Sequence, residues 1–100
     1  MYLKLGRENM TKEIQTEIEQ KIYERAEKTI KMLYFIENVC TNKKTVNYCL
    51  ESEVMQISID AFVLIRNHFI NEQITNDEIM SINEFTIFQI DRIMKFYNIR

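Results

Sequence analysis

The residues of this chain that are best suited to chemistry are few and scattered. The single histidine, His68, follows Arg66 closely, but no serine or cysteine nucleophile accompanies it in a local catalytic signature. We expect His68 to be a hydrogen-bonded, partly buried side chain. The neighbouring acids Asp77 and Glu78 are better explained by a helix start, where carboxylates meet the positive end of the helix dipole. The sequence therefore predicts a protein that is not an enzyme and has no catalytic residues.

A metal or cofactor site is equally unsupported. Cys40 and Cys49 are the only thiols, and with His68 they supply three of the four ligands that a tetrahedral zinc site needs. A single glycine cannot build a phosphate-binding loop. We expect both cysteines to be free, buried thiols, and we predict neither a metal nor a cofactor.

The composition is that of one small globular domain spanning residues 1–100. Hydrophobic residues make up 46% of the chain and charged residues 28%, with a formal net charge of −2. The mild acidity argues against a dedicated nucleic-acid binder. Neither a membrane-spanning apolar run nor a secretory signal pattern is present, so we expect a soluble cytoplasmic protein. One glycine and no proline favour long helices over loops.

A long helix is predicted from residue 11 to residue 40, with Thr11 as its N-cap. Residues 1–10 are expected to form a flexible or extended arm. If Met10 rather than Met1 is the natural start, residues 1–9 are a dispensable arm. The apolar positions of the helix recur at steps of three and four, which is the spacing of a seam between paired helices. The seam comprises Ile14, Ile18, Ile22, Ala26, Thr29, Leu33, Ile36 and Cys40.

A second helix is predicted from residue 46 to about residue 71, after a break at residues 41–45. Its seam repeats the same spacing and so predicts an antiparallel helical hairpin with the first helix; it comprises Val46, Leu50, Val54, Ile57, Ala61, Leu64 and His68. Residues 54–60 also alternate like a strand, because Ile57 and Ile59 flank Ser58. We favour helix, because the seam continues for about twenty residues and strands are rarely so long.

The third helix begins with two overlapping start signals. Thr75 and Glu78 form one capping box, and Ser81 and Glu84 form a second. Either a one-turn helix at 76–80 precedes a longer one at 82–97, or only one box is used. One face carries Ile87, Ile90, Ile93, Met94 and Tyr97, with Phe85, Phe88 and Phe96 to its side. The predicted fold class is therefore all-α, a small bundle of three to four helices with a long N-terminal helix and a helical hairpin.

Apolar surface in excess of what such a core needs gives the main functional signal. We predict a small interaction protein, forming a homodimer or binding a protein partner, that modulates or inhibits a larger protein. The predicted partner or dimer interface comprises Met32, Tyr34, Phe35, Phe85, Phe88 and Phe96. Abundant Ile and Asn with little Ala suggest AT-rich codons, and hence a phage or other mobile element of a low-GC bacterium as the source.

Two alternatives remain open at this stage. The first is a dimeric DNA-binding regulator of helix-turn-helix type, whose nucleic-acid contacts would be Lys43, Lys44, Asn47 and Tyr48. The second is a structural piece of a larger assembly. Binding to a membrane surface is not expected, because no predicted helix sets a basic face opposite an apolar one.

Overall fold

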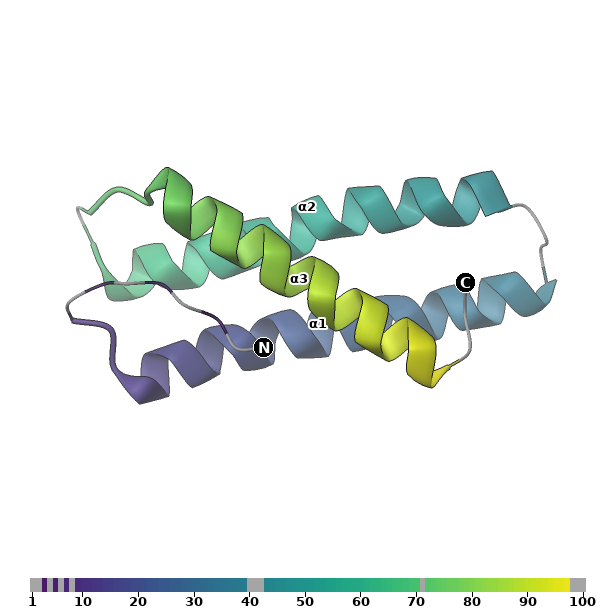
Figure 1. Cartoon of the computed structure of the whole chain (residues 1–100), viewed down its shortest axis with the longest axis horizontal. Helices are drawn as coiled ribbons and strands as arrows, with labels where there is room; N and C mark the ends of the chain where they lie inside the picture. Colours follow the sequence, from purple (N-terminus) through teal and green to yellow (C-terminus); the bar gives the residue numbers. More distant parts are fainter. Residues whose placement is uncertain are drawn as a thin grey trace.

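In a computed structural model, the residues that the structure describes form three helices (Figure 1). The structure describes residues 3, 5, 7, 9–39, 43–70 and 72–97, with the side chains of 36–39 and 43–50 excepted. Helix α1 spans Lys12–Val39, α2 spans Lys43–His68 and α3 spans Asn76–Phe96. All regular secondary structure in these residues is helical, which confirms the predicted all-α class. The predicted break at 41–45 lies partly outside the described residues, and α2 already begins at Lys43.

Helices α1 and α2 run antiparallel along the length of the molecule (Figure 1). Thr29, late in α1, donates a hydrogen bond from Oγ1 to Glu53 Oε2 at 3.0 Å. Arg25 lies between that contact and the start of α1, and its Nη1 is 3.3 Å from Asp60 Oδ2. The residue nearer the start of α1 therefore contacts the residue nearer the end of α2, as expected for an antiparallel pair.

Helix α3 lies across one face of this hairpin and runs in the same direction as α1 (Figure 1). It touches α2 through Ser58 Oγ, which donates a hydrogen bond to Asn83 Oδ1 at 2.7 Å. It touches α1 through Arg92, whose guanidinium lies 5.5 Å from the centre of the Tyr23 ring. At 21 residues α3 is shorter than α1 with 28, so the hairpin extends beyond the C-terminal end of α3.

The core is one apolar cluster between the three helices. The seam residues Ile18, Ile22, Ala26 and Leu33 of α1 are buried in it, as predicted, and Thr29 is nearly so. The cluster comprises Leu3, Leu5, Ile18, Ile22, Ala26, Ile30, Leu33, Ile57, Ala61, Ile65, Phe69, Ile82, Phe85, Ile90 and Ile93. The seam positions Ile36, Cys40, Val46 and Leu50 lie outside the described side chains.

Helix α2 is continuous through the segment that alternates like a strand. Ile57 and Ser58 are buried, whereas the Ile59 side chain points outward and is 43% exposed. The strand-like alternation therefore consists of one core residue, Ile57, and one surface residue, Ile59, of the same helix. His68 is also less enclosed than its seam position suggested, because it lies in the last turn of α2, where the side chain is 32% exposed.

Helix α3 uses only the first of its two start signals. Thr75 is the N-cap, and the Thr75–Glu78 capping box is present with both of its hydrogen bonds. The helix then runs without interruption through Ser81 and Glu84, so the second box caps nothing.

The buried face of α3 differs from the predicted one. Phe85 is only 4% exposed and belongs to the core, whereas Ile87 is 48% exposed. The core-facing row runs through Ile82, Phe85, Thr86, Gln89, Ile90 and Ile93. Ile87 lies about 100° around the helix from its buried neighbour Thr86, which is enough to turn its side chain out of the core.

The N-terminal segment packs into the core, in contrast to the expected dispensable arm. The side chains of Leu3 and Leu5 are buried among those of the helices. The backbone N–H of Leu3 donates to Glu19 Oε2 at 2.8 Å, and Gln15 Nε2 donates to the Leu3 carbonyl. Leu3 and Leu5 thus each supply a core side chain, and Gln15 and Glu19 hold the backbone of Leu3 against the first turns of α1.

Because Leu3 is fully buried, the variant Leu3→Ala should lower the free energy of unfolding by about 2–4 kcal/mol, through lost burial and the cavity left behind. Urea denaturation followed by circular dichroism measures the change. Ile70→Ala is the control, since Ile70 is 73% exposed and its truncation should cost little. Equal losses in the two variants would contradict the core position of Leu3.

Candidate functional site

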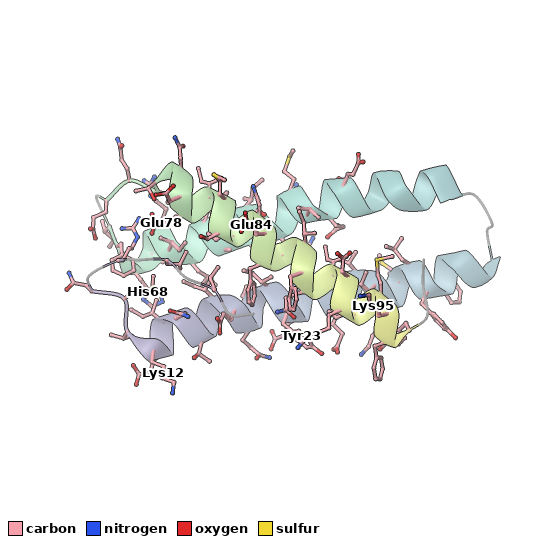
Figure 2. The ribbon with its side chains drawn as sticks, in the orientation of Figure 1. Lys12, Tyr23, His68, Glu78, Glu84 and Lys95 are labelled. Carbon is pink, nitrogen blue, oxygen red and sulfur yellow. The ribbon has the colours of Figure 1, made fainter. Side chains whose placement is uncertain are left out.

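A charged network closes the end of the molecule where the N-terminal segment, the α2–α3 loop and the start of α3 meet. Arg7 makes a two-pronged ion pair with Glu78, through Nε to Oε2 and through Nη2 to Oε1 at 2.9 Å. The side chains are 10% and 4% exposed respectively. Figure 2 shows Glu78 at this end, in the first turn of α3. Such planar, paired contacts are the strongest that an arginine makes with a carboxylate.

The same two side chains engage every neighbouring segment. Glu78 Oε1 accepts a hydrogen bond from the backbone N–H of Thr75 at 2.9 Å, which completes the capping box. Arg7 Nη2 donates to the Gln73 carbonyl at 2.8 Å, and the guanidinium lies 4.8 Å from the centre of the Phe69 ring. The ion pair thereby joins the N-terminal segment, the loop and α3 in one contact set.

A polar cleft of about 660 Å³ opens beside this network and is lined by Leu5, Arg7, Glu72, Gln73, Thr75, Asp77, Glu78 and Ser81. Arg7 and Glu78 are already paired with each other, and Glu72 lies 3.6 Å from Arg7 Nη1. The one basic side chain of the cleft is thus engaged by two of its three acidic side chains, the third being Asp77. We therefore assign the network a structural role.

Replacing Glu78 by glutamine should lower the free energy of unfolding by about 3 kcal/mol, because the guanidinium of Arg7 would remain buried without its counter-ion. Chemical denaturation is the measurement. The control is Lys28→Ala, which alters an exposed side chain of α1 and should change stability by less than about 0.5 kcal/mol. A Glu78→Gln protein as stable as the control would show that the pair contributes nothing.

Aromatic side chains gather at the opposite end of α3, where it meets α1. The rings of Tyr34 and Tyr97 are tilted, with centroids 5.7 Å apart, and Phe96 meets Tyr97 edge-on at 5.2 Å. Phe96 is 81% exposed, and Phe35, the neighbour of Tyr34 along α1, is 68% exposed. We call these four residues, Tyr34, Phe35, Phe96 and Tyr97, the aromatic end.

The residues predicted as an interface are thus only partly brought together. Met32 is 59% exposed but lies seven residues, two helical turns, from Arg25, on the side of α1 that faces α2. Phe88 is 38% exposed and lies about two turns from Phe96 along α3. Phe85 is buried in the core and offers no surface to a partner.

The remaining candidate residues either lie outside the described part of the chain or make surface contacts. The side chains of Lys43, Lys44, Asn47, Tyr48 and Cys49, and the whole of Cys40, lie outside the described residues. His68 Nε2 is 2.9 Å from Glu17 Oε2, in a surface contact between the start of α1 and the end of α2. Within the described part of the chain, three or more metal-binding side chains do not cluster anywhere.

The contacts that complete both ends were not predicted from the sequence. Tyr97 was assigned to a packing face, yet it bridges Tyr34 and Phe96. Arg7 and Glu78 stand 71 positions apart, and no local pattern signals such a pair. The helical spacing of Glu78 from the core residues Ile82 and Phe85 was the available hint that this acid would be buried.

Comparison of the chain with models of protein families, with curated proteins and with solved structures finds no match. Among the described helices, none is long and apolar enough to cross a membrane.

Proposed function

We propose that this chain is a small, non-catalytic interaction protein that binds a larger protein through the aromatic end and so modulates or inhibits it. The observation that carries the proposal is the ring cluster of Tyr34, Phe96 and Tyr97, in which Tyr34 and Phe96 are exposed. Phe35 is also exposed and lies about 100° around α1 from Tyr34. Aromatic side chains dominate the energetics of protein interfaces, because each buries a large area with few rotatable bonds.

The position of the cluster supports a docking role. Helix α3 ends at Phe96, while α1 continues to Val39 and, with α2, extends beyond it (Figure 1). The rings of Tyr34, Phe96 and Tyr97 meet where the end of α3 lies against α1. A partner helix or loop that packs on them would cover rings that the three helices leave exposed.

The chemistry-bearing side chains that the structure describes support the non-catalytic part of the proposal. His68 is engaged with Glu17, and Arg7 with Glu78, in contacts that join segments of the fold. The alternative of a helix-turn-helix regulator gains no support, because that element joins helices crossing at about 90–120°. Here α1 and α2 are long and antiparallel.

The test is capture of partners by the tagged chain from cells of its natural source, with the double variant Phe35→Ser and Phe96→Ser in parallel. A partner that binds through the aromatic end should be retained by the wild type and reduced at least about tenfold with the variant. Bound protein is identified by mass spectrometry, and bound nucleic acid is assayed in the same eluates.

The matched control is Ile70→Ser, which removes an equally exposed apolar side chain from the other end of the molecule. It should retain the partner. Loss of the partner from both variants, or from neither, would contradict the assignment of the aromatic end. Recovery of DNA in place of protein would contradict the proposed function.

A further inference from the structure

A second apolar surface surrounds the contact between α2 and α3. Ser58 of α2 donates its hydrogen bond to Asn83 of α3. Side chains three and four positions from each residue share its side of the helix. The exposed residues at these positions are Met55 on α2, at 65%, and Met80 and Ile87 on α3, at 59% and 48%.

The same surface continues along α2 at helical spacing. Ile59 and Val63 follow Met55 at steps of four, and Val63 is 52% exposed. We call Met55, Ile59, Val63, Met80 and Ile87 the α2–α3 face. On α2 it runs from Met55, which shares the side of Ser58, around to Val63, which lies three positions from Asp60 and so borders the charged contacts of Glu53 and Asp60 with Arg25 of α1.

We propose that the α2–α3 face is the two-fold interface of a homodimer, in which α2 packs antiparallel against α2 of a second copy. This surface is separate from the aromatic end, and the inference does not rest on the proposed partner. An isologous interface needs a surface that is complementary to itself. The side chains and the charges of α2 meet that requirement.

The apolar side chains are self-complementary about Ile59. In an antiparallel pair centred there, Ile59 faces its own copy, and the long Met55 faces the short Val63 of the second chain at both ends. Residues spaced by four form the ridges that interlock in the commonest class of helix packing. Met80 and Ile87 of α3 widen the apolar surface on one side of this seam.

The charges of α2 are self-complementary about the same centre. Between Glu51 and Arg66, the exposed residues of α2 are Ser52, Met55, Gln56, Ile59 and Val63, and none of them is charged. The antiparallel arrangement brings Glu51 of each copy within one residue of facing Arg66 of the other. A parallel arrangement would set Glu51 against Glu51 and Arg66 against Arg66. Opposite charges at the two ends of an uncharged stripe therefore select an antiparallel second copy.

Sedimentation equilibrium of the purified full chain over a wide range of concentration tests the proposal. The wild type should approach twice its monomer mass of 12.2 kDa as the concentration rises. Ile59→Glu sets two carboxylates against each other at the two-fold axis and should raise the dissociation constant at least about thirtyfold. Phe35→Glu, on the exposed face of α1, is the matched control and should dimerise like the wild type.

Charge exchange separates a specific interface from a general loss of folding. Glu51→Arg and Arg66→Glu should each weaken the dimer, because each sets like charges together. The double variant carrying both should regain it, with helix content unchanged by circular dichroism. A wild type that stays at 12.2 kDa at every concentration would overturn the proposal, as would an Ile59→Glu dimer of wild-type strength. A double variant weaker than both single variants would overturn the antiparallel arrangement.

Discussion

The buried ion pair between Arg7 and Glu78 is the contact on which the arrangement of the bundle depends. It fixes the N-terminal segment against the start of α3, and Glu78 also caps that helix through Thr75. Helix α3 therefore begins at a fixed place, and its 21 residues carry it about 30 Å along a hairpin whose first helix is about 42 Å long. The end of α3 therefore meets α1 short of the end of the hairpin, where Tyr34 and Phe96 are exposed.

The fold was predictable where local pattern decides it. The capping box of Thr75 and Glu78 needs only residues three apart, and the structure shows it with both hydrogen bonds. The side of each helix that faces the core was less predictable. In α3 apolar residues cover most of the circumference, so the sequence did not distinguish the buried Phe85 from the exposed Ile87. The packing of α3 against α1 and α2 decides which of its apolar residues face the core, and the spacing of residues in the sequence does not show this. In α2, Ile57 and the exposed Ile59 alternate with Ser58 as in a strand, because an apolar residue also stands on the exposed side of this helix.

The candidate sites divide in a similar way. Tyr34 and Phe96 were predicted as surface aromatics from the excess of apolar residues, and both are exposed. Their meeting through Tyr97 depends on where α3 ends relative to α1, which is a consequence of tertiary structure. The contact of Arg7 with Glu78 joins residues 71 positions apart, so no local sequence pattern predicts it. Charge balance along a single helix, by contrast, is visible in the sequence once the exposed face is known.

A double-mutant cycle tests the dependence of the bundle on its ion pair most directly. The free energies of unfolding of the wild type, Arg7→Met, Glu78→Gln and the double variant are measured by urea denaturation. A buried pair that joins two segments predicts a coupling energy of about 2–3 kcal/mol, so that the double variant is much less destabilised than the sum of the single variants. Additive losses, with a coupling energy below about 0.5 kcal/mol, would contradict the central place given to this contact.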